Sequence, residues 1–354
     1  MNKQILIHIG PPKSGTSAIQ YALHNARHIL RCEGIDYPRH EVGPNGISSG
    51  NMNTILSLNE DGKWQVCEDK IQHVLNEFER SDLDMLLLSS EYFFYLAKEI
   101  AKSIPQAQFI AYLRCPLETF ESSYNQSVKR HMRTTALSFG KNLHITSLNI
   151  LTETIQHIGK KRFILRAYLP ISEQGYNLIE DFWSAAGLPD MPSSKVVTNN
   201  SYCFEALEFK RWLNQFELTN LDTAIDQALQ AFSDRIQLFS FLPKELFERY
   251  QKQALHNVRD FVHDNKVFNG KILITYLKHR SSLKHLEQTL SKEDLTYVCA
   301  HLALHHSVLY SQICSKLNRY TSSDSELTEK IILVLNHQKN YRTLLAKIMR
   351  RIKW

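Results

Sequence analysis

The stretch ILIHIGPPKSGTSAIQ, residues 5–20, decides the fold, because an apolar run, a glycine-bounded loop and a helical pattern follow one another in it. Gly10 and Gly15 have the spacing of the nucleotide-binding loop G-x-x-x-x-G-K-[ST], but Thr16 stands where the lysine belongs and Lys13 lies inside the loop. The first N–H groups of a helix point toward an anion, and the helix dipole favours its negative charge. The stretch therefore predicts a phosphate-binding loop whose cation is displaced.

Outward from this stretch, short apolar runs alternate with longer helical patterns. Strands are predicted at Ile5–Ile9, Met85–Ser89, Phe109–Leu113 and Phe163–Tyr168, and helices near 17–32, 68–80, 93–103, 117–131 and 145–158. The alternation predicts an α/β fold, a P-loop-like three-layer α/β/α arrangement with a central parallel sheet. From Phe204 onward nearly every segment has a helical pattern. The turn formers of DNKVFNG, residues 264–270, suggest a core at 1–268 and a helical C-terminal extension at 269–354.

A second motif, FIAYLRCPLETFESSYNQ, occupies residues 109–126. Its strand ends at Arg114, Pro116 suits the first turn of the next helix, and Glu118 complements the positive end of that helix. Ser122 follows Arg114 by eight positions. The pattern favours an anion site, although by itself it also fits an arginine paired with a carboxylate and a serine that faces solvent.

Both motifs resemble those of sulfotransferases that use 3′-phosphoadenosine 5′-phosphosulfate (PAPS). PKSGTS, residues 12–17, resembles their 5′-phosphosulfate loop, and Arg114 and Ser122 have the spacing of the arginine and serine that hold the 3′-phosphate of the donor. LDMLLLSSEYF, residues 83–93, is similar to the strand ending in S-S-E of bacterial carbohydrate sulfotransferases, whose loop reads like HIGPPKTGT. The resemblance covers about the first two-thirds of the chain and makes 1–268 a core with PAPS-binding loops.

The resemblance implies a PAPS-dependent enzyme that moves a sulfuryl group to a hydroxyl of a glycan or glycolipid and releases 3′-phosphoadenosine 5′-phosphate (PAP). The hydroxyl attacks sulfur in line, a base removes its proton, and Lys13 neutralises the oxygen of the departing PAP. A sulfuryl group carries less negative charge than a phosphoryl group, so a lysine and backbone donors are expected to serve without a metal. The residues implied to hold the donor are Pro12, Lys13, Ser14, Gly15, Thr16, Ser17, Arg114 and Ser122.

Two residues are candidates for the base. Glu91 follows the strand at 85–89, where related cytosolic sulfotransferases carry a catalytic histidine, and ligand sites of α/β sheets form at this edge. Partial burial raises the pKa of a carboxyl group toward a useful value. Glu91 equally suits a cap or an ion pair at the start of the helix from Tyr92. His40, just before the glycine-rich segment 41–53, is the alternative base.

Composition restricts the class of protein and its location. The net charge of +6 comes from 42 basic and 36 acidic residues, a mixture that does not indicate nucleic acid as a partner. Six cysteines without a CxxC or CxxH pairing argue against a zinc site or a disulfide framework and favour a reducing cytoplasm. No apolar run reaches the roughly 18 residues of a membrane span. His301 and His305 are spaced for a metal but lack an acidic third ligand, so we expect a helix surface there.

Basic residues gather near the C-terminus. Between Lys330 and Trp354 there are seven lysines and arginines and no acidic residue, and one helical face carries Leu344, Leu345, Ile348, Met349 and Ile352. Such a helix suits peripheral contact with an anionic membrane at its inner face, and packing on the extension is the alternative. A second basic run, SVKRHMR at 127–133, is expected to be a solvated helix end.

Two other classes of function stay open at this point. One is an NTP-dependent kinase with a divergent P-loop, which a magnesium requirement would reveal. The other is a non-catalytic anion-binding relative that kept the fold. The kinase lacks a lysine directly after Gly15, and Glu91 is its sole candidate for an acidic strand end.

Overall fold

The structure is a computed structural model that describes residues 3–42, 48–170, 175–189, 201–320 and 323–352, without the side chains of 342 and 344–352. The chain divides into two compact units, each built from three segments. The first unit comprises 1–120, 141–198 and 248–280, and the second comprises 121–140, 199–247 and 281–354. The division is therefore interleaved, and the boundary suggested after residue 268 falls inside the first unit.

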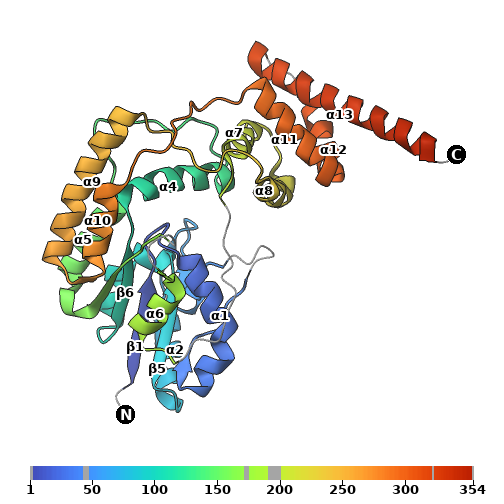
Figure 1. Cartoon of the computed structure of the whole chain (residues 1–354). Coiled ribbons are helices and arrows are strands. Elements are labelled where there is room, and N and C mark those ends of the chain that lie inside the picture. The colour runs from blue at the N-terminus through green and yellow to red at the C-terminus, as the bar shows by residue number, and fades with distance from the viewer. Residues whose placement is uncertain (1–2, 43–47, 171–174, 190–200, 321–322, 353–354) are drawn as a thin grey trace. The chain divides into compact units, whose positions relative to one another are not determined.

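The first unit is built on a parallel sheet whose described strands have the order β2-β5-β1-β6-β7-β8, of which Figure 1 labels β5, β1 and β6. Ile7 of β1 lies opposite Leu88 of β5 on one side and Phe109 of β6 on the other. The predicted strands are confirmed, whereas β2 and β8 have two residues each and carry no periodic signal. The bounds are β1 Gln4–Ile9, β2 Ile35–Asp36, β5 Met85–Ser90, β6 Gln108–Leu113, β7 Phe163–Ala167 and β8 Val267–Phe268.

Helices cover the sheet because both of its faces are apolar. Helices α1 (Thr16–Cys32) and α6 (Leu178–Ala186) pack on the face that buries Leu6 and Leu87. Ile7 and its neighbours on the opposite face are equally buried, as in parallel sheets covered on both sides. The predicted three-layer α/β/α fold is thus confirmed.

The other elements of this unit complete the predicted alternation. Helix α3 begins at Ala97 rather than 93, because Tyr92–Phe94 form a separate 3-10 turn, η2. Outside the main sheet, β3 (Leu56–Leu58) and β4 (Trp64–Val66) pair as an antiparallel hairpin. The remaining helices are α2 (Glu68–Arg80), α5 (Thr146–Ile158), α10 (Gly270–His279) and most of α9 (Lys244–Asp264).

The second unit is helical in its described residues, as predicted for the C-terminal part. It includes the later turns of α4 (Pro116–Arg130), and α11 packs against α7, α12 and α13. The predicted helix near the C-terminus is present as α13, whose apolar side chains from 344 onward lie outside the described residues. The bounds are α7 Phe204–Leu213, α8 Asp222–Ala231, α11 Lys292–His305, α12 Ser307–Leu317 and α13 Ser325–Ile352.

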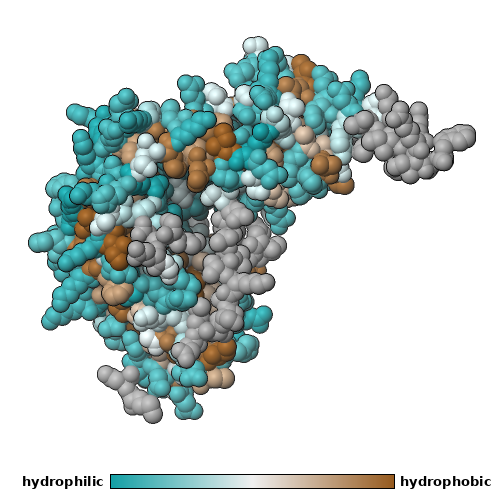
Figure 2. Space-filling model, in the orientation of Figure 1, coloured by the Kyte–Doolittle hydropathy of each residue, from teal (hydrophilic) through white to brown (hydrophobic). Residues whose placement is uncertain are grey.

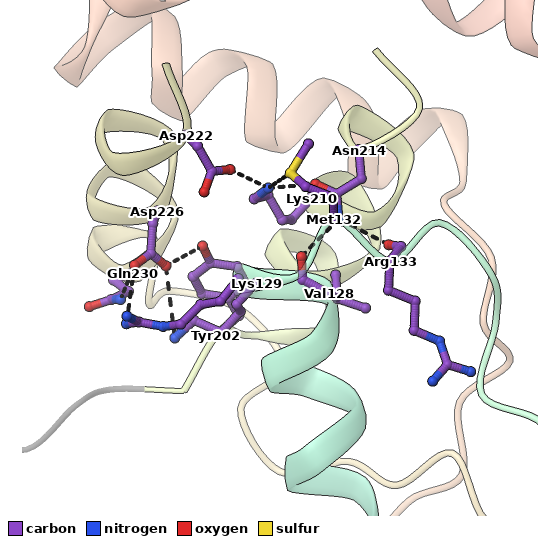
Figure 3. Close-up of polar contacts among 11 residues, drawn as sticks. Val128, Lys129, Met132, Arg133, Tyr202, Lys210, Asn214, Asp222, Asp226 and Gln230 are labelled. Carbon is purple, nitrogen blue, oxygen red and sulfur yellow. Dashed lines mark hydrogen bonds and ion pairs between the residues drawn. The ribbon is translucent and has the colours of Figure 1, made fainter. Parts of the chain in front are cut away.

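Helix α7 buries a lysine inside the second unit. Lys210 is 1% exposed and donates hydrogen bonds to Asp222 Oδ1 at 2.7 Å and to the side-chain oxygen of Asn214 (Figure 3). Asn214 in turn donates to the carbonyl oxygen of Val128 in α4 at 2.8 Å. A buried cation is tolerated because it is paired and hydrogen-bonded. This network joins α4, α7 and the start of α8.

Part of the basic run at 127–133 is also paired rather than solvated. Asp226 of α8 accepts a hydrogen bond from the Tyr202 hydroxyl at 2.5 Å and pairs with Arg130 at 3.4 Å and Lys129 at 3.9 Å (Figure 3). The Lys129 side chain is 13% exposed, so the prediction of a solvated helix end is wrong for this residue. Burial lowers the pKa of Lys129 to about 8, and Asp226 opposes that shift.

The surface gives no sign of a large apolar patch on the side that Figure 2 shows. That face is mostly hydrophilic, and its apolar residues lie in small separate groups. Scattered apolar residues are normal on protein surfaces and call for no partner. Among the described residues, no helix combines the length and the apolar content needed to cross a membrane.

Candidate functional site

The loop between β1 and α1 is a tight turn that needs both of its glycines. Gly15 has φ +83°, in the left-handed region, and a Cβ atom there would lie 2.2 Å from Cδ2 of Leu178. A Cβ atom on Gly10 would lie 1.8 Å from Oγ1 of Thr16. Lys13 also has a positive φ, 68°, which is uncommon for a residue with a side chain. The loop therefore has a defined backbone path around the displaced lysine.

The residues that follow Lys13 differ in what they offer an anion. Ser14 is buried and donates its N–H and its hydroxyl to the carbonyl oxygen of Pro11, at 3.2 and 2.6 Å, so it stabilises the turn. Thr16 is 4% exposed, and its Oγ1 has no hydrogen-bond partner among the described residues. Pro12 and Ser17 are half-buried. The first N–H groups of α1 have no partner within the helix, so they and Thr16 Oγ1 form the donor set of the loop.

Three neighbouring strands bring the predicted charged residues to one edge of the sheet. The segments that leave the carboxyl ends of β1, β5 and β6 carry Lys13, Glu91 and Arg114. The connection from β1 leads to the β5 side of the sheet and that from β6 leads to the β7 side, so β1 and β6 define a topological switch point. Ligands of open α/β sheets bind at such a point.

Arg114 connects the second motif to the loop. Its Nη1 donates a hydrogen bond to the backbone oxygen of Lys13 at 2.6 Å, and its Nε donates to Oε2 of Glu118 at 3.0 Å. The guanidinium also lies 4.7 Å from the centre of the Tyr168 ring. The Arg114 side chain is 22% exposed, so part of it faces solvent while its base is fixed. Arg114 thus adds positive charge directly beside the loop between β1 and α1.

Glu118 was expected to complement the positive end of α4, but its side chain also binds residues far away in the sequence. Besides Arg114, it accepts hydrogen bonds from the Tyr276 hydroxyl and from Arg280 Nη1, the latter at 2.9 Å. The pairing of Arg114 with a carboxylate, one of the two interpretations left open, is therefore present. With two arginines around one carboxylate, the cluster keeps a net positive charge. Nothing in the sequence around residues 276–280 indicated these contacts.

Glu91 follows β5 directly and lies near Lys13. Burial raises the pKa of Glu91 above its ordinary value, and the positive charge of Lys13 opposes this effect. Its side chain makes no capping hydrogen bond to η2. The alternative role of Glu91 as a helix cap is therefore not observed, whereas its electrostatic attraction to Lys13 is present.

The segment before Asn53 lies along the end of β5. Asn51 Oδ1 accepts a hydrogen bond from Ser89 N at 2.7 Å, and the Ser90 hydroxyl donates to the carbonyl oxygen of Ser49 at 2.7 Å. Ser90 Oγ also accepts from Tyr92 N at 3.1 Å, so it caps η2 in place of Glu91. Residues 43–47 of this glycine-rich segment lie outside the described residues.

His40 is buried among neutral partners instead of facing solvent. Its Nε2 lies 3.1 Å from the Tyr37 hydroxyl, and its Nδ1 lies 2.7 Å from Ser48 Oγ. Burial lowers the pKa of His40, with the nearby His24 and Arg27 adding to the effect. Both ring nitrogens are therefore occupied within this cluster, and its described contacts do not include Lys13 or Glu91.

Ser122 belongs to the part of α4 assigned to the second unit and is half-buried. Its role at a 3′-phosphate stays a prediction. His301 is half-buried, with Nε2 3.3 Å from the Ala228 carbonyl oxygen, and its ring lies 4.9 Å from that of His305. No group of three or more histidine, cysteine or acidic side chains suited to a metal occurs in the described residues.

Comparison with known proteins gives one weak structural likeness. The crystal structure of a sulfotransferase from Alicyclobacillus acidocaldarius matches 66% of this chain and 98% of its own, at 12% identity and a TM-score of 0.34. No protein-family model matches the chain, and no curated protein does. A TM-score this low does not decide a function, so the functional assignment rests on the residues and geometry of the site.

Proposed function

We propose that this protein is a PAPS-dependent sulfotransferase that acts on a hydroxyl group. The observation that carries the proposal is the hydrogen bond from Arg114 to the backbone of Lys13. This bond holds the cation of the second motif against the loop of the first, at the switch point of the sheet. This contact supports the proposal that the two motifs act as one cationic site for an anion, as the donor of this enzyme class requires.

The position of the lysine favours sulfuryl transfer over phosphoryl transfer from a nucleotide. In the nucleotide-binding loop the lysine follows the last glycine, where it reaches the terminal phosphates. Here Thr16 takes that position, and Lys13 lies within the turn, two residues before Gly15. Because a sulfuryl group carries less charge than a phosphoryl group, one lysine with backbone and hydroxyl donors is enough to stabilise its transfer.

The residues of the site fit the donor. The resemblance implies that Thr16 contacts the 5′-phosphosulfate group, and its buried Oγ1 has no described partner. The N–H groups that open α1 would hold the same group, with Gly15 keeping the backbone close to it. Arg114, and Ser122 by the resemblance, would hold the 3′-phosphate.

In the proposed reaction, a bond forms between the acceptor oxygen and sulfur as the bond from sulfur to the bridging oxygen of the donor breaks. Glu91 takes the proton of the acceptor hydroxyl, and its raised pKa makes it a stronger base than an exposed glutamate. Lys13 neutralises the charge that develops on the bridging oxygen of PAP. His40, whose nitrogens are occupied, is the weaker choice for the base.

The acceptor is proposed from the resemblance alone. A carbohydrate hydroxyl on a glycan or glycolipid agrees with the bacterial sulfotransferases that the loop resembles, and the mixed surface charge suits neither DNA nor RNA. A cytoplasmic enzyme with α13 at the inner membrane face would meet a lipid-linked acceptor. The carbohydrate acceptor and the location at the membrane are separate from the proposed donor site, and a test of donor binding does not address them.

Calorimetric titration with PAP, and separately with ATP and ADP plus magnesium, tests the proposal. Wild-type protein should bind PAP without metal, and Arg114→Ala and Lys13→Ala should each weaken binding at least about tenfold, the effect of one charged hydrogen bond. Arg80→Ala is the matched control, because Arg80 is exposed at the end of α2. Binding of the magnesium nucleotides alone would favour the kinase, and binding of neither would favour the non-catalytic relative.

A further inference from the structure

The outer edge of β5 loses its strand partner before the chain reaches Glu91. Among the described strands, β2 pairs with this edge only at Met85 and Leu86. All 6 residues of β5 are buried, and buried backbone N–H and carbonyl groups need hydrogen-bond partners. On this side, the strand end that leads to Glu91 is therefore satisfied by something other than the sheet.

Asn51, which is 1% exposed, takes the place of the missing strand. Its Oδ1 accepts a hydrogen bond from Ser89 N at 2.7 Å, and its own backbone N–H donates to the Ser89 carbonyl oxygen at 3.2 Å. Its Nδ2 donates to the Leu87 carbonyl oxygen at 3.5 Å. Gly50 permits this approach, because it has φ +70° and a Cβ atom there would lie 1.8 Å from the Ser89 carbonyl oxygen. Residues 48–51 therefore form an anchor segment along the end of β5.

The anchor segment also holds the residue that precedes Glu91. The Ser90 hydroxyl donates to the carbonyl oxygen of Ser49 at 2.7 Å and accepts from Tyr92 N at 3.1 Å. The residues on both sides of Glu91 are thus tied to one oxygen atom. The Ser90 carbonyl oxygen in turn accepts from Gly10 N at 3.4 Å. The backbone that carries Glu91 is therefore fixed between the anchor segment and the loop that follows β1.

His40 fixes the other end of the anchor segment. Ser48 Oγ accepts a hydrogen bond from Gly50 N at 2.8 Å and lies 2.7 Å from Nδ1 of His40. This nitrogen also lies 3.2 Å from the Glu41 carbonyl oxygen, which can only accept, so the ring proton belongs on Nδ1. Nε2 then accepts from the hydroxyl of Tyr37 at 3.1 Å. The buried imidazole is therefore held on one side and holds Ser48 on the other.

We infer that His40 and Ser48 are positioning residues, which hold Glu91 in place through the anchor segment. His40 thus supports the proposed base and does not replace it. A base has to lie within hydrogen-bonding reach of the proton that it removes, so a loosened strand end slows proton transfer while the donor site stays intact. The catalytic part of this inference rests on the proposed function, whereas the connection from His40 to the end of β5 does not.

Hydrogen exchange of the full-length protein, followed by mass spectrometry, tests the connection without donor or acceptor. In Ser48→Ala, the peptide 88–95, which contains the bonded N–H groups of Ser89 and Tyr92, should exchange at least about tenfold faster than in the wild type. Ser81→Ala is the matched control, because Ser81 Oγ also accepts from the N–H two residues later, at 3.3 Å, but at the end of α2. Equal exchange of this peptide in the two variants would overturn the inference.

Cleavage of PAPS with water as the acceptor tests the catalytic part. A water oxygen bonds to sulfur, the bond from sulfur to the bridging oxygen breaks, Glu91 takes the proton of the water, and sulfate and PAP are released. At saturating PAPS, Ser48→Ala and His40→Ala should each lower the rate about fivefold or more, while the Kd for PAP stays within about twofold.

A conservative variant separates positioning from proton transfer at His40. The amide N–H of His40→Asn can replace Nδ1–H toward Ser48, but the amide cannot act as a base. His40→Asn should therefore recover most of the rate lost in His40→Ala. An asparagine variant as slow as the alanine variant, or a wild-type rate in Ser48→Ala, would overturn the inference. If the wild type does not cleave PAPS, the exchange measurement alone decides it, and a lack of PAP binding as well would refute the proposed function itself.

Discussion

Replacement of Glu91 by glutamine should stabilise the protein at neutral pH while removing its activity. Burial raises the pKa of this carboxyl group in the folded state above the ordinary value of 4.5. At pH 4 the group is largely protonated in both the folded and unfolded states, and the shift costs little. As the pH rises through the folded-state pKa, the folded protein has to hold a buried carboxylate, so its stability falls. Glutamine carries no such penalty.

The size of the effect follows from the linkage between pKa and stability. Each tenfold decrease in the acid dissociation constant of Glu91 on folding lowers the free energy of unfolding at high pH by about 1.4 kcal/mol. For a domain of 150–250 residues, 1 kcal/mol changes the Tm by roughly 2–4 °C, so Glu91→Gln should raise the Tm at pH 7.5 by about 3–6 °C for each such tenfold. The gain should vanish at pH 4. Glu79→Gln, at an exposed position of α2, is the matched control and should change neither Tm.

Two measurements on the same samples would refute this reasoning. A Glu91→Gln variant that melts below the wild type at pH 7.5 would show that the attraction of Lys13 outweighs burial and that the carboxylate is a stabilising group. In the sulfuryl-transfer assay, loss of a general base should reduce kcat at least about a hundredfold with PAP affinity unchanged. Near-normal turnover would remove Glu91 from the mechanism and return His40 to consideration.

Three further changes test other parts of the structure. Gly15→Ala should lower both the Tm and the PAP affinity. It should lower the Tm more than Gly62→Ala does, because both glycines have a positive φ but a Cβ atom at position 62 would meet open space. Equal decreases in Tm would contradict the steric role of Leu178. Lys210→Met should destabilise the protein by about 3 kcal/mol in urea unfolding, at the low end for a broken buried pair, since Asp222 can be hydrated. If the basic residues near the C-terminus bind membranes, the full-length variant Lys347→Glu/Arg350→Glu/Arg351→Glu should lose co-sedimentation with anionic vesicles and should not change with neutral ones. Equal binding of variant and wild type to anionic vesicles would exclude these residues as the membrane contact.

The sequence predicted the fold best where the local pattern is strong. Three of the four long strands, β1, β5 and β6, are almost entirely buried and mostly apolar, and the fourth, β7, is partly so. The loop after β1 is marked by its two glycines, so these features were predictable from short windows. The interleaving of the two units was not predictable in this way. It arises because the chain forms α7 and α8 of the second unit before β8 and α10 complete the first unit. A two-residue strand such as β8 leaves no periodic trace.

The site was predictable in its charged residues but not in their partners. Lys13, Glu91 and Arg114 follow strands, and the carboxyl ends of parallel strands meet at one edge. The contacts that fix Glu118 come from Tyr276 and Arg280, separated from it by more than 150 residues, and no local pattern reports such a pairing. The burial that shifts Glu91 likewise arises from packing that a single sequence does not show.

The displaced lysine and the second motif are structurally coupled, because Arg114 hydrogen-bonds to the backbone of Lys13. A residue with a side chain pays about 1–2 kcal/mol to adopt the left-handed conformation that Lys13 has at φ 68°. The 2.6 Å hydrogen bond from Arg114 to the carbonyl oxygen of Lys13 is charge-assisted and contributes about 1.5–3 kcal/mol, enough to hold that conformation. Because Arg114 is itself fixed by Glu118, the start of α4 sets the backbone from which Lys13 extends. The lysine within the loop is therefore positioned by the strand end that carries the second cation, which is why both motifs are needed to build the site.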